Sequence, residues 1–339
     1  MATNIRDIAR EAGVSSTTVS RVLNGSGYVK EETKALVLKK IKEFNYTPSA
    51  VARSLSNNET NTIGVIVPDI ENPFFGKIIK GISSLADERN LNIILCDTNE
   101  NASKEIKFLN MLKEQRISGI IVTPTNDVNE VNNQQLSVLE NMGIPIVLVD
   151  RDVKHSNFDG VFTDNIGAAY EATSALIKEG HRKIAIITGP NTSKPGRDRL
   201  TGYKKALRMN NIELNEEYLF YGDFMLESGY LCTQDILKME DRPTAILVCN
   251  NMMNLGSIKA IYESKLKIPQ DMAIIGFDEV QMLDVVGLNI SVVSRPNNDM
   301  GKKAMELLLK KMDTKEHTGT VRITLLSKLI LKGSEKLIK

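Results

Sequence analysis

Residues 5–24, with the sequence IRDIAREAGVSSTTVSRVLN, decide the architecture of the N-terminal region. The apolar residues at positions 5, 8, 9 and 12 have the spacing of one helix face. Gly13 follows them, where the end of a helix favours a residue that tolerates positive φ, and Ser15 is suited to cap a second short helix. Helix, glycine-containing turn and helix predict a helix-turn-helix, although a generic two-helix corner fits this spacing equally well.

The first turn of the second predicted helix carries short polar side chains. Ser16, Thr17 and Thr18 lie between the apolar residues Val14 and Val19. This part of a recognition helix is the one that reaches base edges in the major groove of DNA. If the segment is a helix-turn-helix, these three hydroxyl side chains are the candidates for base contacts.

The next segment contains a third amphipathic helix, predicted over residues 31–44. We expect four of its apolar residues to face inward and its lysines to face solvent. The inward residues are Leu36, Val37, Ile41 and Phe44. Thr47 and Pro48 then predict another short helix, with the threonine as its cap and the proline at its first position.

These patterns together closely resemble the DNA-binding headpiece of the lactose/galactose-repressor family of bacterial regulators. The matching sequences are IxDIAxxAGVSxxTVSRVLN at residues 5–24, VKEETxxxV at residues 29–37 and YTPSAVARSL at residues 46–55. A match of this length is far more specific than a helix-turn-helix alone. The resemblance implies a headpiece over residues 1–47 and a hinge helix with a linker over residues 48–61.

The resemblance also implies how the hinge helix works. Residues 49–56 are too short to form a stable helix by themselves, and they are expected to order on operator DNA as the paired hinge helix of a dimer. Leu55 would then wedge into the minor groove, although it could instead cover the core of the headpiece. The expected DNA-binding residues are Ser16, Thr17, Thr18, Ser20, Arg21, Asn24, Tyr28, Ala52 and Leu55.

The composition limits the class of protein. Of the 339 residues, 42% are hydrophobic, so a large core is expected and disorder is not. The net charge is +1, but residues 1–60 carry nine Lys/Arg and six Asp/Glu, a basic head suited to a local contact with DNA. Cys96, Cys232 and Cys249 lack CxxC or metal spacing, which indicates buried thiols in a reducing compartment. No apolar stretch can span a membrane and no signal peptide is present, so we expect a cytoplasmic protein.

From residue 63 onward, apolar runs of strand length alternate with helical segments. This alternation predicts parallel, doubly wound sheets whose two faces are covered by helices. One set of strands ends at residue 150, and a second set opens with a strand at 161–164 and continues to residue 277. A strand at 291–296, a helix at 298–312 and a strand at 321–331 are expected to complete both halves. Ligands bind beyond the C-terminal ends of such strands, so we expect a cleft between two subdomains.

This body resembles the family's effector domain and the periplasmic sugar-binding proteins that share its fold. The resemblance implies an effector-binding and dimerisation domain at residues 62–339, built of two doubly wound α/β subdomains. The N-subdomain is expected at residues 62–162 and 295–322, and the C-subdomain at residues 163–294 and 323–339. The implied ligand-binding residues are Asn72, Phe74, Phe75, Asp150, Arg151, Arg199, Phe224, Asn250, Asp278 and Arg295. Phenyl rings stack on sugars, carboxylates accept hydroxyl protons and arginines donate to oxygens, which suits a polyol.

The sequence departs from the family pattern at three places. Asn250-Asn251 replaces the usual Asn-Asp, Arg295 replaces the usual Gln, and Lys332-Gly333-Ser334 replaces the usual Arg-x-Ser. Arg295 gives the expected cleft residues a net charge of +1, which predicts an anionic ligand such as a sugar phosphate or a sugar acid. The alternative is that Arg295 turns away from the cleft and pairs with Glu279 or Asp299.

We therefore expect a ligand-responsive transcription regulator, a repressor of carbohydrate genes that binds a near-palindromic operator. Because the sequence has no leucine heptad tail, the resemblance implies a homodimer rather than a tetramer. Control by a purine or a partner protein, and a plain solute-binding module, are the alternatives. No GxSxG, Walker A or GxGxxG motif follows a strand, so no enzyme, cofactor or metal is expected. Asp150 and Asp278 could form a glycosidase pair, but acceptance of sugar hydroxyls is the preferred interpretation.

Overall fold

The computed structural model describes residues 4–46, 60–127, 130–154, 156–314 and 319–338. The chain divides into two compact units, Met1–Thr60 and Asn61–Lys339, which are described separately below. The predicted hinge helix, with Ala52 and Leu55, lies outside the described residues. In the described part of the chain, no helix combines the length and the apolar character needed to cross a membrane.

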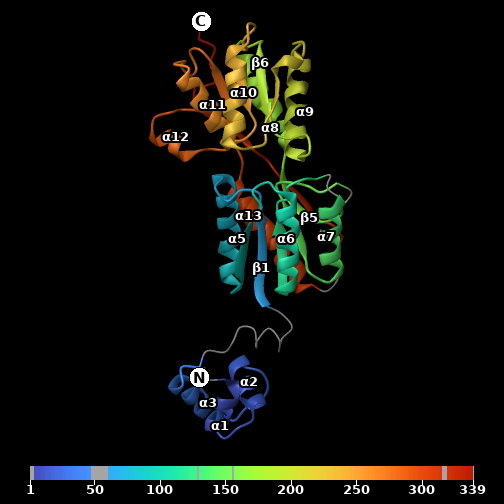
Figure 1. Ribbon diagram of the computed structural model, residues 1–339, viewed down its shortest axis with the longest axis vertical. Helices are drawn as coiled ribbons and strands as arrows, with labels where there is room; N and C mark the ends of the chain where they lie inside the picture. Colours follow the sequence, from blue (N-terminus) through green and yellow to red (C-terminus); the bar gives the residue numbers. More distant parts are fainter. Residues whose placement is uncertain (1–3, 47–59, 128–129, 155, 315–318, 339) are drawn as a thin grey trace. The chain divides into compact units, whose positions relative to one another are not determined.

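The described part of the first unit contains three helices, α1 (Ile5–Glu11), α2 (Ser16–Asn24) and α3 (Glu31–Glu43) (Figure 1). The Asn4 side chain caps α1 by accepting from two backbone N–H groups of its first turn. Gly13 has a φ of +64°, and the Ser15 hydroxyl oxygen caps α2 by accepting from the N–H of Thr18 at 3.1 Å. These local features stop one helix and start the next within a few residues. The predicted helix-turn-helix is confirmed.

A small apolar core holds these three helices together. It consists of Ile8, Ala9, Ala12, Val19 and Val37, with Ile41 and Tyr46 packed against it. Leu36 and Phe44 were predicted to face inward, but they are 42% and 39% exposed. The prediction is wrong because α3 packs through the stripe of Val37 and Ile41, and Leu36 lies about 100° around the helix from Val37. Phe44 follows the last residue of α3, where Tyr46 covers the core instead.

The first subdomain of the second unit is built on a six-stranded sheet in the order β11-β5-β4-β3-β1-β2. Its strands are β1 (Thr60–Val67), β2 (Asn92–Asp97), β3 (Ile117–Val122), β4 (Ile146–Val149), β5 (Asp159–Thr163) and β11 (Arg322–Leu325). Its helices are α5 (Pro73–Glu88), α6 (Ala102–Glu114), α7 (Glu130–Asn141) and α13 (Asn297–Asp313). Alternate strand residues point to opposite faces, so Val147 and Val149 pack with α5 and α13, whereas Ile146 and Leu148 pack with α6 and α7.

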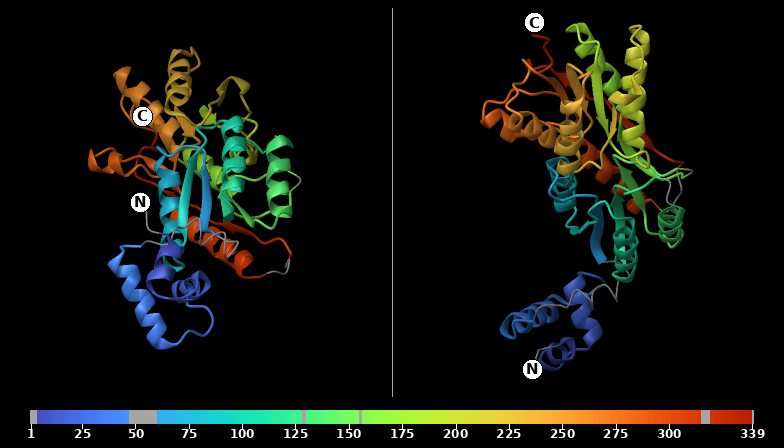
Figure 2. Two further views of the ribbon diagram at one scale, coloured as in Figure 1. Left: turned by 60° about the horizontal axis from the view of Figure 1, so that its bottom comes forward. Right: turned by 45° about the horizontal axis from the view of Figure 1, so that its top comes forward.

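The second subdomain is built on another six-stranded sheet, in the order β12-β10-β9-β8-β6-β7. Its strands are β6 (Ile184–Thr188), β7 (Leu219–Tyr221), β8 (Ala245–Val248), β9 (Ala273–Phe277), β10 (Ser291–Ser294) and β12 (Lys328–Ile330). Its helices are α8 (Asn165–Lys178), α9 (Lys194–Met209), α10 (Leu226–Lys238), α11 (Asn251–Glu263) and α12 (Gln281–Val285). Figures 1 and 2 show α8 and α9 on one side of this sheet and α10 and α11 on the other.

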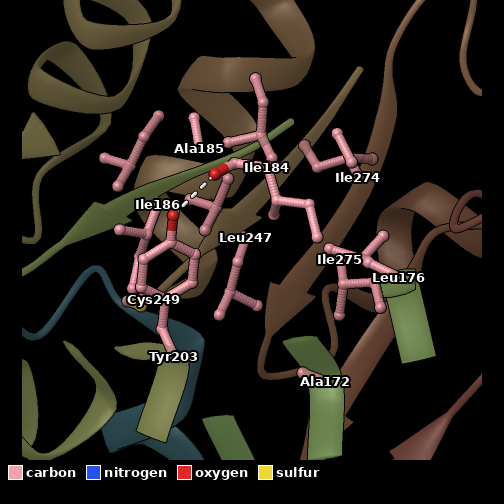
Figure 3. Packing of buried hydrophobic residues seen from close by; sticks show 14 of the residues in the cluster. Ala172, Leu176, Ile184, Ala185, Ile186, Tyr203, Leu247, Cys249, Ile274 and Ile275 are labelled. Atoms are coloured by element: carbon pink, nitrogen blue, oxygen red, sulfur yellow. Dashed lines mark hydrogen bonds between the residues drawn. The ribbon is translucent and has the colours of Figure 1, made fainter. Parts of the chain in front are cut away.

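Apolar residues of the central strands fill the core of the second subdomain. Tyr203, from α9, buries its ring among them, and its hydroxyl donates to the carbonyl oxygen of Ile184 at 2.7 Å (Figure 3). A buried phenol is stable only when its hydroxyl has such a partner. Apart from β12, which is antiparallel to β10, the strand pairs of this sheet are parallel. The predicted fold class of a helix-turn-helix headpiece and two doubly wound subdomains is confirmed.

The chain crosses between the subdomains after β5, after β10 and after β11. The single strand predicted at residues 321–331 is wrong, because this stretch forms β11 in the first sheet and β12 in the second. The first subdomain therefore extends to Leu325 rather than to residue 322. Strand β5, which was predicted to open the second set, belongs to the first sheet, so the boundary follows Thr163 rather than residue 162. Strand β1 begins at Thr60, inside the predicted linker.

Candidate functional sites: the recognition helix and the cleft

The first half of α2 carries the predicted recognition surface of the headpiece. Among the described residues of this prediction, Thr17, Arg21 and Tyr28 are exposed, and Ser16, Thr18 and Ser20 are half-buried. The Thr18 hydroxyl lies 2.9 Å from the Ser15 hydroxyl, so Thr18 takes part in the helix cap. Thr17 is then the most open of the three polar side chains in the first turn. Asn24 is the last residue of α2.

A cavity lies between the two subdomains, at the C-terminal ends of their parallel strands. The structure brings all ten residues of the predicted ligand site to its lining. Five further residues line it: Asp69, Glu100, Pro195, Met225 and Asn251. The space between the side chains is about 400 Å³ with the mouth included. Open α/β sheets bind ligands at this edge, so the cavity is the candidate effector site.

Two carboxylates reach the cavity from equivalent positions in the two subdomains. Asp150 follows β4 and Asp278 follows β9, and their φ angles are +65° and +61°. Their backbone N–H groups donate to Val161 in β5 and to Val293 in β10, each at 2.9 Å. Aspartate tolerates this left-handed conformation better than most residues. The repeated β/α pattern thus places one buried acid from each subdomain at the same cavity.

Arg295, which follows β10, lies between these two carboxylates. Its Nε and Nη2 donate to the two oxygens of Asp278, with an Nε–Oδ1 distance of 2.9 Å. Its Nη1 donates to Asp150 Oδ1 at 2.6 Å, and its Cζ lies 3.8 Å from the centre of the Phe74 ring. Burial by itself lowers the pKa of Arg295, but Asp278 and Asp150 outweigh burial and raise the pKa above its ordinary value. Arg295 is therefore a charged bridge between the subdomains.

These contacts change the predicted charge of the cleft. Arg295 does not turn away toward Glu279 or Asp299, and two carboxylates of the cleft balance its charge. With Asp69 and Glu100 included, the lining carries three arginines and four acids rather than a surplus of positive charge. The reason given for an anionic ligand is therefore wrong, because the sequence pattern showed neither of these two acids.

Glu100 holds Arg151 within the first subdomain. Arg151 Nη1 and Nη2 donate to the two Glu100 oxygens at 2.7 and 2.5 Å. Nη1 also donates to the carbonyl oxygens of Pro124 and Thr125, each at 3.3 Å. Burial lowers the pKa of Arg151, but Glu100 outweighs burial and raises it. Both terminal nitrogens of this guanidinium therefore donate to protein oxygens. Its Cζ also lies 5.1 Å from the centre of the Phe224 ring in the second subdomain.

Arg199, on α9, is buried without a carboxylate partner. Its Nε donates to Asn165 Oδ1 at 2.8 Å and its Nη1 donates to the carbonyl oxygen of Cys249. No carboxylate of the described residues lies within ion-pair distance of Arg199. Burial and the neighbouring Arg295 lower its pKa to about 10, so it remains charged at neutral pH. A desolvated guanidinium in this state favours an oxygen-bearing ligand.

Comparisons with known proteins place this cleft and this headpiece in one family. Residues 60–333 match the family model described as periplasmic binding proteins and sugar binding domain of LacI family. Residues 4–49 match the model described as bacterial regulatory proteins, lacI family. The chain belongs to the LacI family.

Its similarity to individual LacI-family proteins covers nearly the whole chain. The transcriptional repressor PurR of Edwardsiella ictaluri is 38% identical over 322 residues, which are 94% of this chain and 93% of that protein. The lac repressor dimer bound to operator and the anti-inducer ONPF has a TM-score of 0.85 at 25% identity, covering 99% and 100% of the two chains. The regulator CelR in complex with cellobiose has a TM-score of 0.73 at 28% identity, covering 98% and 99%. The chain is thus a transcription regulator with a DNA-binding headpiece and an effector domain.

In this LacI-family chain, asparagines of the cleft bind protein groups. Asn250 Oδ1 accepts from the N–H of Met253 at 2.8 Å, and its Nδ2 donates to the carbonyl oxygen of Phe224 at 2.7 Å. Asn250, predicted as a ligand residue, therefore caps α11 and positions Phe224. Asn72 Oδ1 caps α5 and accepts from Asn251 Nδ2 at 2.8 Å, which joins the two subdomains. The aspartate usual at position 251 in the family has no N–H group to make this bond.

A second ion pair joins the subdomains beside the cleft lining. Arg197, on α9, donates through Nη1 to Asp127 Oδ1 at 3.2 Å and through Nη2 to Asp127 Oδ2. The Asp127 backbone N–H also donates to the carbonyl oxygen of Thr192 at 3.3 Å. Sequence reasoning missed this pair, because its members lie far apart in the chain and no local pattern links them.

Other chemistry in the cleft has little support from its geometry. The carboxylates of Asp150 and Asp278 both accept from one guanidinium, which is not the environment of a separate acid and nucleophile. Burial raises the pKa of the Cys249 thiol to about 12, so this cysteine is not a thiolate. Within the described ranges, no cluster of three or more His, Cys, Asp or Glu residues is suited to a metal ion.

Proposed function

We propose that this LacI-family regulator represses carbohydrate genes, binds a near-palindromic operator as a homodimer, and takes a sugar as its effector. The observation that carries the sugar proposal is the convergence of Asp150 and Asp278 on one cavity beside Arg199. Carboxylates accept from hydroxyl groups and a guanidinium donates to ring or hydroxyl oxygens. A polyol presents both kinds of group at once. The similarity to the CelR-cellobiose complex supports the same ligand class.

The proposed switch depends on contacts with both subdomains. A ligand bound by Asp150 from one side and by Asp278 and Arg199 from the other favours one angle between the subdomains. Such a ligand changes operator affinity only if it binds one arrangement more tightly than the other. The crossings after β5, β10 and β11 are the connections about which the subdomains would turn.

A purine base is the second candidate effector. The flat faces of Phe74 and Phe224 would stack on a base as well as on a sugar ring, and the relative at 38% identity is the repressor PurR. Arg199 would then donate to a ring oxygen or nitrogen of the base. Titration of operator-bound protein with neutral sugars and with hypoxanthine separates the two candidates.

The DNA-binding part of the proposal is tested with Thr17→Ala in the full-length protein. We expect this change to lose about 1–3 kcal/mol of discrimination between a selected operator and a random duplex, because Thr17 is the open polar side chain at the start of α2. Fluorescence anisotropy at physiological salt measures both affinities. Ser103→Ala, on the exposed face of α6, is the matched control and should change neither. Equal binding of operator and random DNA by the wild type would refute sequence-specific binding.

The effector part is tested with Arg199→Gln, which removes a buried positive charge that has no carboxylate partner among the described residues. We expect operator binding to survive and the response to sugar to be lost. Arg208→Gln lies on the exposed face of the same helix, α9, and should respond as the wild type does. If Arg199→Gln responds at the wild-type sugar concentration, Arg199 does not contact the effector.

A further inference from the structure

The guanidinium of Arg295 occupies the centre of the recognition groups of the cleft. It bonds both oxygens of Asp278 and one oxygen of Asp150, and it covers one face of the Phe74 ring. These are one carboxylate from each subdomain and an aromatic face, which are the groups that a sugar would use. The side-chain exposures of Arg295, Asp150 and Asp278 are 4%, 6% and 2%, so water screens these contacts very little.

The same contacts determine how the subdomains hold together. Without a cation between them, Asp150 and Asp278 would be two negative charges converging in a buried cavity. Two carboxylates close enough to contact the same guanidinium repel each other. Arg295 replaces this repulsion by its own attraction to a carboxylate of each subdomain. Arg295 itself belongs to the crossing segment after β10, so it can bridge the subdomains without belonging firmly to either.

We propose that Arg295 is an internal ligand of the cleft, which bridges the equivalent carboxylates of the two subdomains and competes with an uncharged hydroxyl-bearing effector for them. An anionic effector is disfavoured, because it would gain only the charge of Arg199 and would meet Asp69, Asp150 and Asp278. A cationic effector that displaced Arg295 would add a third positive charge beside two buried guanidinium groups, Arg295 and Arg199. The part of this proposal that concerns the effector rests on the proposed sugar control.

The ion pair of Arg197 and Asp127 provides a matched comparison for the contacts of Arg295 within the same protein. It joins the same two subdomains through a similar two-pronged contact, and the exposure of the Arg197 side chain is 31%. Neither residue lines the cavity. A substitution there weakens the connection between the subdomains and leaves the charge of the cleft unchanged.

The first test is thermal unfolding of the full-length protein. We expect Arg295→Gln to lower the melting temperature by about 6–10 °C, because it leaves two buried carboxylates without their cation. Adding Asp278→Asn should restore at least half of that loss, since only one acid then remains. Arg197→Gln should be less costly, and Asp278→Asn should not rescue it. If Asp278→Asn fails to rescue Arg295→Gln, repulsion between the carboxylates is not the cause and the bridging role is wrong.

The second test is calorimetric titration with D-ribose, D-glucose, D-ribose 5-phosphate and D-gluconate. We expect a neutral sugar to bind Arg295→Gln at least about tenfold more tightly than it binds the wild type, because the internal competitor is gone. Arg197→Gln should change that affinity less. A lower affinity of Arg295→Gln would show that Arg295 contacts the sugar directly, and tighter binding of either anion by the wild type would overturn the ligand class. If none of these compounds binds any variant, both the proposed sugar control and the proposed competition between Arg295 and a sugar are refuted. The thermal rescue experiment then decides by itself whether Arg295 bridges the two carboxylates.

Discussion

The two subdomains bring an aspartate to the cleft in the same way, but they treat their arginines differently. In the first subdomain, Arg151 directly follows Asp150 and is neutralised by Glu100. In the second, Glu279 follows Asp278, and Arg199 has an amide and a carbonyl oxygen as its partners in the described part of the chain. The arginine of the first half is thus neutralised within its own subdomain, whereas the arginine of the second half is a buried charge with no carboxylate partner among the described residues. We infer that the first half is a fixed wall and that the second half gains most from an effector.

Removing one charge from each half is the most direct test of this difference between the two halves. Glu100→Gln leaves Arg151 buried without a carboxylate, and we expect it to lower the free energy of unfolding by about 3 kcal/mol. Arg199→Gln removes a charge that has no carboxylate partner, so its cost should be much smaller. Thermal and denaturant unfolding of the two variants measures this difference.

The effector response should show the opposite order. Arg199→Gln loses the response, and Glu100→Gln keeps part of it where the protein remains folded. If Arg199→Gln is the more destabilising of the two, the unpaired charge of the second half has a structural role, and the proposed division between the two halves is wrong.

A steric change at Gly189 tests the contact between Phe224 and Arg151, where the two halves of the cleft touch. A Cβ on Gly189 would lie 2.0 Å from Cζ of the Phe224 ring, so Gly189→Ala must displace this ring from its present position. The contact between Phe224 and Arg151 would be lost, at a cost of about 1–3 kcal/mol in the free energy of unfolding. Effector affinity should fall as well. Gly76→Ala on α5, where an added Cβ meets nothing within 4 Å, is the control and should be neutral or slightly stabilising.

The sequence predicted the secondary-structure elements and the strand ends that line the cleft better than it predicted the hydrogen-bond partners of the side chains there. Strands β4 and β9 are uniformly apolar because both of their faces are buried, and their positions were predicted to within a residue or so. Parallel strands of one sheet end at the same edge, and the two sheets face each other through these edges across the cleft, so residues placed at strand ends, such as Asp150 and Asp278, lie in one cavity. The bond between Asn72 and Asn251 joins residues 179 positions apart, and no local pattern indicates it. The same reason explains why the sequence did not indicate Asp150 and Asp278 as the partners of Arg295.

A polar change tests the bond between the halves without removing a charge pair. Asn251→Asp takes away the side-chain N–H group that donates to Asn72 Oδ1 and adds a fifth carboxylate to the cavity lining. We expect a loss of about 1–2 kcal/mol in the free energy of unfolding. Asn110→Asp on the exposed face of α6 is the control and should have almost no effect. Equal stability of Asn251→Asp and the wild type would show that this bond does not hold the subdomains together.

Each subdomain also contains a buried titratable group away from the cleft lining, and burial shifts the pKa values of these two groups in opposite directions. In the first subdomain, Glu105 accepts from the N–H of Thr125 at 2.7 Å and from Asn132 Nδ2 at 2.9 Å, but burial dominates and raises its pKa. In the second, His181 Nδ1 lies 2.8 Å from the Thr244 hydroxyl and its Nε2 lies 3.1 Å from the carbonyl oxygen of Glu335, and burial lowers its pKa. Burial disfavours the charged form of both side chains.

The smallest expected effect is therefore a pair of opposite pH slopes, each at most about 1.4 kcal/mol per pH unit. The folded protein binds a proton on Glu105 more tightly than the unfolded chain does, so this group makes stability fall as pH rises from about 4.3, the ordinary glutamate pKa, to the raised pKa. The folded protein binds a proton on His181 less tightly, so this group makes stability fall as pH drops from about 6.5 to the lowered pKa. Relative to the wild type, the His181→Gln variant should become more stable as pH falls. The Glu105→Gln variant should become more stable, relative to the wild type, as pH rises toward neutral. Thermal unfolding between about pH 4.5 and pH 8 measures both differences. If the two variants differ from the wild type by constant amounts across this range, neither buried group titrates with folding.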